Sequence, residues 1–216
     1  MLKGLGTFLF KGNNMKKMIA AAALVALTSH AQAALFNFTG NIAYNTDVVQ
    51  INFTLVNDAT NVRVWTDSFK SGVNFDPITA LWNRTSGARI AENDDNAQVN
   101  PSTQTYFDSG FTLANLAAGE YAFTVAAYRN FAGTNLSDPF DYELNNVTRV
   151  RIEDWCQPAS NNCQNQKGNF WSVWLDGVDN ASNPNDPGNN VPEPSSIALA
   201  ALGLMGLASL RRRQAN

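Results

Sequence analysis

Histidine is almost missing from this chain of 216 residues, which has one His, two Cys and only 15% charged residues. The single histidine, His30, lies in a segment that we interpret below as a removable leader. The rest of the chain therefore has no imidazole for general-base catalysis or a catalytic triad, which excludes most hydrolase mechanisms. Two cysteines are too few for a cysteine-rich zinc site, and without histidine a catalytic Cys/His pair is excluded as well.

Charged side chains are scarce, and asparagine is abundant instead, with 28 copies. Between residues 34 and 190 there are 17 acidic and 8 basic residues, a difference of nine negative charges. Such a segment repels phosphate backbones and anionic lipid surfaces. We therefore expect no nucleic-acid partner, and we expect divalent cations or neutral polymers as ligands.

The first 33 residues have the pattern of a secretory signal peptide, with basic, apolar and small residues in that order. These parts are Lys16 and Lys17, the apolar run 18–28, and Ala31-Gln32-Ala33. We predict that signal peptidase cleaves between Ala33 and Ala34 and that the protein is exported into an oxidising compartment. A signal peptide carries its basic patch at the N-terminus, so translation starts at Met15 or, with a longer leader, at Met1.

The C-terminal end begins with a Pro/Asn/Gly-rich stretch at 183–190, which predicts a flexible linker. A proline motif, an apolar run and a basic cluster follow: Val191-Pro192-Glu193-Pro194, residues 197–210, and Arg211, Arg212 and Arg213. As a helix, the apolar run spans ~21 Å, which is marginal for a ~30 Å hydrocarbon core. The arginines are expected on the cytoplasmic side, which leaves the preceding domain outside the cell.

The features of residues 191–213 resemble the PEP-CTERM sorting signal of Gram-negative bacteria. The resemblance implies that the tail enters the inner membrane transiently and that a membrane-embedded exosortase recognises and cleaves it. It also implies a place at the cell surface or outside the cell, usually in organisms that make extracellular polysaccharide and biofilm. A plain C-terminal membrane anchor is the alternative, and it would leave the domain outside as well.

Between the two ends, apolar and polar residues alternate, which is typical of half-buried strands. The segment 49–55 shows this clearly, with Val49, Ile51 and Phe53 on one face. The predicted strands are 35–44, 49–55, 62–66, 78–82, 88–92, 106–113, 121–125, 147–152 and 169–175. We therefore predict an all-β domain over 34–182, a β-sandwich or jelly roll of about nine strands, with hydrophobic helices only in the signal peptide and the sorting tail.

Several short motifs between residues 75 and 125 form a second pattern. They are Phe75-Asp76-Pro77-Ile78, Leu81-Trp82, Gly87, Ile90-Ala91, Asn93-Asp94-Asp95 and Gly119-Glu120-Tyr121. Together they are similar to bacterial pre-peptidase C-terminal-like domains, which are small β-sandwiches. The resemblance implies an accessory or surface-binding module without a catalytic role.

The two cysteines, Cys156 and Cys163, bracket a short polar loop. In an exported protein this arrangement predicts a disulfide. Closing a ring of this size contributes about 2.5 kcal/mol, which is enough to hold a loop in place. The spacing is not that of a Cys-x-x-Cys motif, so a redox role is the less favoured alternative.

An acidic cluster follows the predicted strand 88–92. Asn93, Asp94 and Asp95 supply the hard oxygen ligands that Ca²⁺ prefers, and Asp76 can join them from the neighbouring strand. The alternative is a turn in which Asp and Asn side chains cap their own backbone, and both interpretations stay open at this stage. A second cluster, at 176–180, is interpreted as a turn. Calcium is the only cofactor that the sequence indicates.

Aromatic residues are candidates for stacking on sugar rings, because they combine an apolar face with a polar group. The candidates are Trp155, Trp171, Trp174 and Tyr106, and core packing is the alternative for each. If their strand is regular, Trp171 and Trp174 point to opposite faces.

Taken together, the sequence predicts an exported, non-enzymatic protein of the cell surface or extracellular matrix that binds calcium and polysaccharide in a biofilm. The alternative is a secreted glycan-active hydrolase that uses carboxylates. Asp94, Asp95 and Asp108 are its candidate catalytic residues.

Overall fold

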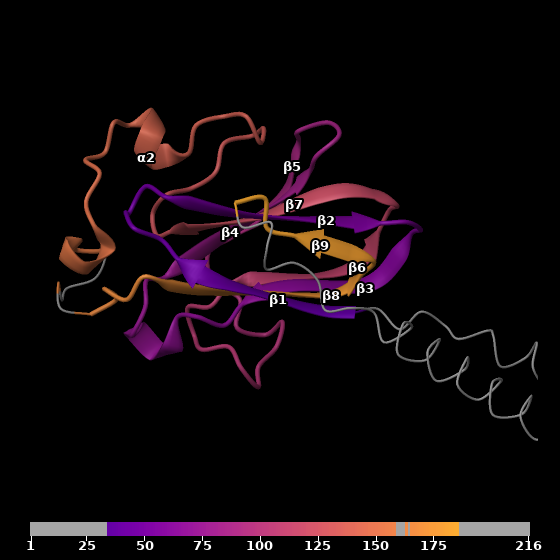
Figure 1. The fold of residues 1–216 in the computed structure, drawn as a ribbon, viewed down its shortest axis with the longest axis horizontal. Coiled ribbons are helices and arrows are strands. Elements are labelled where there is room, and N and C mark those ends of the chain that lie inside the picture. The colour runs from indigo at the N-terminus through magenta and orange to yellow at the C-terminus, as the bar shows by residue number, and fades with distance from the viewer. Residues whose placement is uncertain (1–33, 159–162, 164, 186–216) are drawn as a thin grey trace, which may run out of the picture. The chain divides into compact units, whose positions relative to one another are not determined.

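The computed structural model describes residues 34–158, 163 and 165–185, and these residues form a two-layered β domain (Figure 1). Two antiparallel sheets of four and five strands confirm the predicted all-β class. Within the described residues, no helix is long and apolar enough to cross a membrane. The predicted signal peptide, with Ala31 and Ala33, and the predicted sorting tail, with its proline motif and arginines, lie outside the described residues.

The four-stranded sheet has the order β1-β8-β3-β6. Its strands are β1 (Ala34–Asn41), β8 (Phe170–Val178), β3 (Ala59–Thr66) and β6 (Gly110–Leu116). In β1, for example, Phe36 and Phe38 are buried, whereas the residues next to them are exposed. This sheet therefore has one face in the core, as the alternation in the sequence predicts.

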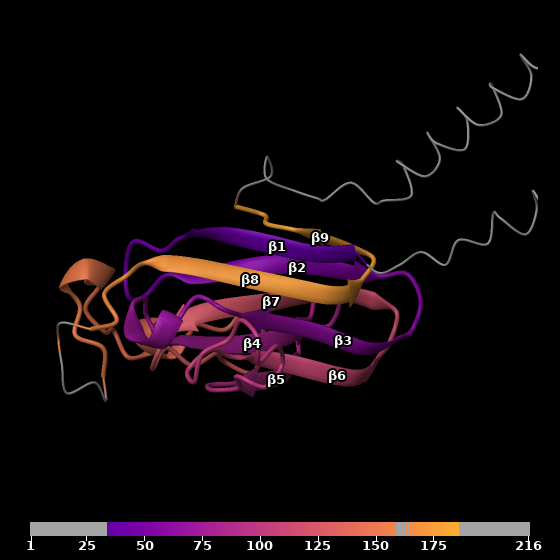
Figure 2. The same cartoon turned by 90° about the horizontal axis from the view of Figure 1, so that it is seen from below.

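The five-stranded sheet has the order β5-β4-β7-β2-β9 and forms the other layer (Figure 2). Its strands are β5 (Arg89–Asn93), β4 (Pro77–Asn83), β7 (Gly119–Ala127), β2 (Val48–Leu55) and β9 (Asn180–Ser182). The central strands β4 and β7 are buried along nearly their whole length. Both faces of this sheet are therefore covered near its middle.

The main core lies between the two sheets. Ile51 and Phe123 of one sheet and Val64 and Leu175 of the other are almost completely buried there. The rings of Phe111 and Phe123 meet edge to face across this interface, with centroids 6.3 Å apart. All described strands and this core lie within residues 34–185, so this segment contains the whole described fold.

A smaller cluster covers the other face of the five-stranded sheet. Trp82 is fully buried there, and Leu136 and Phe140 of the segment after β7 pack against this cluster. The segment continues into the one-turn helix α2 (Asp141–Leu144) at one end of the sandwich (Figure 1). The two other short helical turns are η1 (Lys70–Gly72) and η2 (Ile152–Asp154).

Two strand predictions differ from the structure. The segment 147–152 forms no named strand and makes only an isolated bridge, between Arg151 and Tyr44. The side chain of Asn45 supplies further contacts, since it accepts from the N–H of Val150 and donates to the carbonyl of Thr148. The predicted strand 106–113 begins only at Gly110, since Asp108 caps the turn before it. β9, which has three residues, was not predicted.

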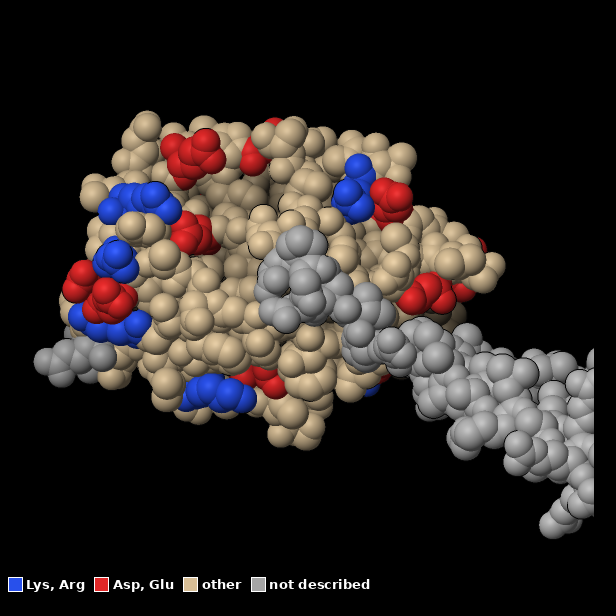
Figure 3. Space-filling view, viewed as in Figure 1, with Lys and Arg blue, Asp and Glu red and all other residues tan. Residues whose placement is uncertain are grey.

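The surface is largely neutral, as the composition indicates. On the face drawn in Figure 3, charged side chains are few and lie towards the margins, mostly beside a charge of opposite sign. Among the described residues, Arg149 and Asp47 form an ion pair in which Nη2 and Oδ1 are 3.4 Å apart.

Candidate metal centre

Strand pairing brings the predicted calcium ligands to one end of the five-stranded sheet. Asp76 directly precedes β4, and Asp94 and Asp95 directly follow β5. β4 and β5 are antiparallel neighbours, and Thr79 pairs with Asn93. The start of one strand therefore lies beside the end of the other, which places the three aspartates together.

The three aspartates are close enough to share one cation. Each offers a carboxylate oxygen, and these three oxygens lie within 4.8 Å of one another. Ca²⁺ binds oxygen ligands at about 2.3–2.6 Å, so two ligands on opposite sides of the ion stand about 4.6–5.2 Å apart. The spacing therefore fits a calcium ion that contacts all three.

These aspartates line a pocket of about 160 Å³ together with residues from three other segments. Phe107 comes from the loop before β6, and Tyr128 directly follows β7. Gln157, Pro158 and Gln166 come from the connection between η2 and β8.

Three buried oxygens at this pocket accept no hydrogen bond. They are Oδ1 of Asp76, Oδ1 of Asp94 and Oε1 of Gln166. Asp76 as a whole is only 6% exposed. A buried acceptor without a donor is costly and calls for an explanation, and a cation satisfies several such oxygens at once.

The electrostatics of the pocket show how strongly it opposes uncompensated negative charge. Burial, together with the charges of Asp95 and Asp94, raises the pKa of Asp76 from 3.8 to about 8. Burial, with Asp95 and Glu92, raises the pKa of Asp94 to about 6. Burial also raises the pKa of Asp95. A bound cation would reverse this balance, since its positive charge favours the ionised carboxylates.

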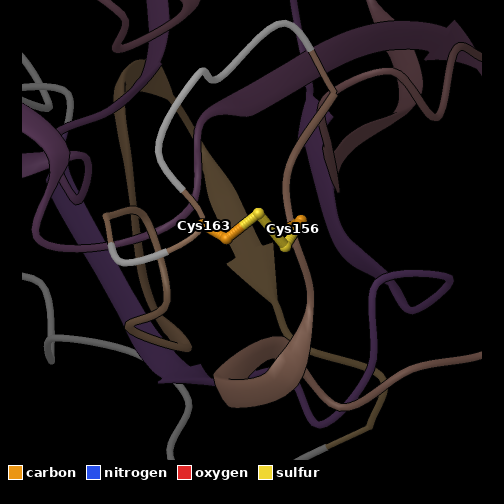
Figure 4. Close-up of a disulfide and its surroundings, with 2 residues drawn as sticks. All are labelled: Cys156 and Cys163. Atoms are coloured by element: carbon orange, nitrogen blue, oxygen red, sulfur yellow. A yellow bond between two sulfur atoms is a disulfide. The ribbon is translucent and has the colours of Figure 1, made fainter.

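Gln157 fixes the position of Asp76 in the pocket through two hydrogen bonds. Its Oε1 accepts from the backbone N–H of Asp76 at 3.1 Å, and its Nε2 donates to Oδ2 of Asp76 at 3.3 Å. The neighbouring Cys156 forms a disulfide with Cys163, as predicted from the sequence (Figure 4). The disulfide therefore closes the loop that carries Gln157 and Pro158.

Two predicted site residues are engaged elsewhere. The side chain of Asn93 donates to the carbonyl of Gly110 at 3.1 Å, and Asn93 does not line the pocket. Asp108 is fully buried, and it accepts from the N–H groups of Phe69 and Thr105. It also lies outside the pocket lining, so it stabilises the turn before β6.

Gln157 and Gln166 were missed by sequence reasoning. Gln157 lies 81 residues from Asp76, and neither glutamine belongs to an acidic cluster or a recognisable motif. The one available signal was the pair of cysteines nearby, which indicated a constrained loop but not what the loop contacts.

The second acidic cluster does not form one turn. Asp176 belongs to β8 and pairs with Arg63, whereas Asp179 accepts from the N–H of Val56 at 2.7 Å. Both carboxylates thus have partners in the fold.

Among the aromatic candidates, Trp155 and Trp171 are buried in the core. Tyr106 is 59% exposed, and its ring packs edge to face on Phe69. Trp174 lies on the opposite face of β8 from Trp171, as the alternation predicts.

Comparison with known proteins identifies one segment of the chain. The profile of the PEP-CTERM protein-sorting motif matches residues 190–213. This agrees with the resemblance of the tail and supports an exported protein that is processed by exosortase. No curated protein and no solved structure matches the chain. The likeness of residues 75–125 to pre-peptidase C-terminal-like domains therefore remains a prediction.

Proposed function

We propose that this is a non-enzymatic protein of the cell surface or extracellular matrix that binds one Ca²⁺ ion in the acidic pocket and, with it, extracellular polysaccharide. Export and exosortase processing supply the location. The observation that carries the proposal is the set of buried oxygens without donors, from Asp76, Asp94 and Gln166, at a single pocket.

Calcium suits the pocket better than magnesium. Mg²⁺ requires oxygens at about 2.0–2.1 Å in near-ideal octahedral geometry and keeps several of its waters. A pocket of about 160 Å³ whose ligands stand up to 4.8 Å apart matches the longer bonds and looser geometry of Ca²⁺.

Calcium binding is tested by calorimetric titration of CaCl₂ into the chelator-treated domain of residues 34–190. We expect one Ca²⁺ per domain and weaker binding of Mg²⁺. Asp94→Asn should weaken binding at least tenfold, or about 1.4 kcal/mol. Glu143→Gln removes one negative charge at an exposed position of α2 and serves as the matched control. Equal Ca²⁺ affinity in the two variants would show that the acidic pocket is not the calcium site.

Polysaccharide binding is tested by co-sedimentation of the same domain with the extracellular polysaccharide of the producing organism, in Ca²⁺ and in EDTA. Binding that is weaker in EDTA supports a contribution of the calcium site, and binding that is unchanged in EDTA assigns the polysaccharide to a surface other than the acidic pocket. If no binding occurs in either buffer, the polysaccharide part of the proposal is wrong and a protein partner becomes the next target.

A carboxylate-dependent glycan hydrolase is the second candidate, and the raised pKa values of Asp76 and Asp94 favour it, because a general acid must be protonated near neutral pH. The spacing is less suitable. Glycosidases separate their two carboxyl groups by about 5–9.5 Å across the sugar, whereas these oxygens lie within 4.8 Å of one another. Release of reducing sugar over time, lost in Asp94→Asn, would support the hydrolase and contradict the non-enzymatic proposal.

A further inference from the structure

A second cavity, separate from the acidic pocket, lies on the outer face of the four-stranded sheet, which is turned towards the viewer in Figure 2. Alternation along β3 and β8 points Trp65 and Trp174 outwards, while Val64 and Leu175 point into the core. The two tryptophans are direct partners across the strands. Their rings are nearly parallel, with centroids 6.1 Å apart and planes inclined by 10°.

Other side chains complete this tryptophan slot, which we define as the cavity lined by Trp65 and Trp174. Leu35 of β1 borders it and is 49% exposed. Asn100 and Thr103 line it from the loop between β5 and β6. The cavity holds about 270 Å³. Sites for drug-sized ligands begin near 300 Å³, so this slot suits a single small ring.

The indole N–H groups of the slot are unsatisfied. Nε1 of Trp65 and Nε1 of Trp174 are both buried and donate to no acceptor. Buried indole N–H groups normally find a partner, because leaving one without an acceptor costs free energy. Both donors belong to tryptophans that line the cavity, but the nitrogen atoms themselves are shielded from solvent, so a ligand oxygen reaches them only when the indole rings turn.

Charge at the slot is balanced. Arg63 and Asp176 are cross-strand partners, and Arg63 donates from Nε to Oδ2 of Asp176 at 3.1 Å. The guanidinium also lies 5.3 Å from the ring centroid of Trp65. Because the two charges neutralise each other, the slot favours a neutral ligand over a phosphate, a carboxylate or a basic peptide.

We propose that the tryptophan slot binds one neutral sugar ring of a glycan. The C–H face of the ring packs on Trp174 and Leu35, since sugar rings present an apolar face that suits an aromatic partner. Its hydroxyl oxygens meet Asn100 and Thr103, and they accept from the indole N–H groups once the rings turn towards the bound sugar. This inference rests on the proposed function in expecting extracellular polysaccharide as the source, but it needs no calcium.

The test uses the five indole N–H signals of the ¹⁵N-labelled domain of residues 34–190, one for each tryptophan. The probes are the methyl α- and β-pyranosides of glucose, galactose and mannose, titrated in EDTA to about 100 mM, well above a millimolar dissociation constant. We expect saturable shifts of the Trp65 and Trp174 signals with at least one glycoside, while the other three stay in place. No shift of these two signals with any glycoside would overturn the proposal.

Variants connect the shifts to the slot. Trp174→Ala should abolish the shift of the Trp65 signal, whereas Thr112→Ala, at an exposed position of β6, should leave it unchanged. If Trp174→Ala does not fold, Trp174→Phe keeps an aromatic face and should weaken binding at least threefold. An unchanged affinity in the folded variant would overturn the proposal.

One further variant separates the two sites. Asp76→Asn should weaken calcium binding at least tenfold and keep the glycoside-induced shifts. If the shifts also disappear, the sugar binds at or through the acidic pocket and the slot is not its site. If calcium binding fails in the parent domain while the shifts remain, the proposed function is wrong and the slot stands alone.

Discussion

Asp76 owes its chemistry to its position one residue before a fully buried strand. Because β4 is covered on both faces, the carboxyl that precedes it is drawn away from water. Gln157 satisfies one of its oxygens and leaves the other without a partner. Asp76 is therefore the residue that most strongly indicates a bound cation. Its ionised carboxylate is also the most costly one in the pocket to bury when no cation is present.

The first prediction concerns the substitution Asp76→Asn. We expect Ca²⁺ affinity to fall at least tenfold, because the most deeply buried ligand loses its charge. Without calcium at pH 8, we expect the variant to be more stable than the parent domain, since an amide does not have to ionise in a buried pocket. Calorimetry measures the first effect and urea unfolding in EDTA measures the second. A variant that is less stable in EDTA would contradict this account.

The second prediction concerns pH. The raised pKa of Asp76, about 8, means that the folded domain keeps a proton that the unfolded chain loses near pH 3.8. Between these values the folded state binds more protons, so the free energy of unfolding falls as pH rises, by up to about 1.4 kcal/mol per pH unit for one proton. Asp94 adds to the slope below its pKa of about 6.

We therefore expect urea unfolding in EDTA to show stability that declines from about pH 5 to pH 8, and saturating Ca²⁺ to remove most of the decline. Asp76→Asn should flatten the curve in EDTA. If the parent domain shows the same slope with and without Ca²⁺, the pocket does not bind the ion.

At the scale of elements, the connection between η2 and β8 matters most. It brings Gln157 and Gln166 to the end of the sheet where β4 begins and β5 ends. The disulfide holds the first part of this connection. The loop therefore acts as one wall of the pocket, and the ion would join the loop to the sandwich.

The third prediction follows from this wall. Replacing both cysteines, Cys156→Ser with Cys163→Ser, should weaken Ca²⁺ binding at least tenfold, because Gln157 and Gln166 are then less well held. The free energy of unfolding in EDTA should fall by no more than about 2.5 kcal/mol. Calorimetry measures the Ca²⁺ affinity, and urea unfolding measures the free energy of unfolding. Reduction of the parent domain with dithiothreitol is the control. Unchanged calcium affinity would show that the loop contributes no ligand.

Elements also show where local patterns mislead. The segment 147–152 alternates in the way a strand does, but its partner is the short stretch 43–45, which it contacts through backbone hydrogen bonds and through the side chain of Asn45. The result is one isolated bridge in place of a strand pair. The alternation of apolar residues indicates only which side chains are buried. It does not indicate whether the backbone of the segment bonds to a strand or to a side chain.

At the scale of the whole domain, one core joins the two sheets. Phe123 of β7 is fully buried and meets Phe111 of β6 across the interface. The faces that the two sheets turn towards each other are buried only because the sheets pack together. Folding should therefore be a single cooperative event, as in other domains of this size.

The fourth prediction tests that cooperativity. Phe123→Ala should lower the free energy of unfolding by about 3–5 kcal/mol, because it removes a large side chain and leaves a cavity between the sheets. Val56→Ala, at a position that is 72% exposed, is the control and should change stability by less than about 0.5 kcal/mol. Both are measured by urea unfolding followed by tryptophan fluorescence. A loss below about 1 kcal/mol for Phe123→Ala would argue against a shared core.

The sequence alone determined the features that depend on residues close together along the chain. Alternation such as that of Val49, Ile51 and Phe53 predicted the strands and the all-β class, because each face of a strand recurs every second residue. The tail motif at 191–213 indicated the sorting route, since such signals are linear, and the matched profile covers 190–213. The two cysteines indicated a disulfide because they lie close together in the chain.

The tertiary structure alone decided which of these residues act together. Asp76 and Asp94 meet because β4 and β5 pair, and Gln157 joins them from 81 residues beyond Asp76. The partnership of Trp65 and Trp174 likewise depends on the pairing of β3 with β8. No local pattern specifies such contacts, because strand order and loop packing minimise the free energy of the whole domain, whereas propensity and alternation describe only a few consecutive residues.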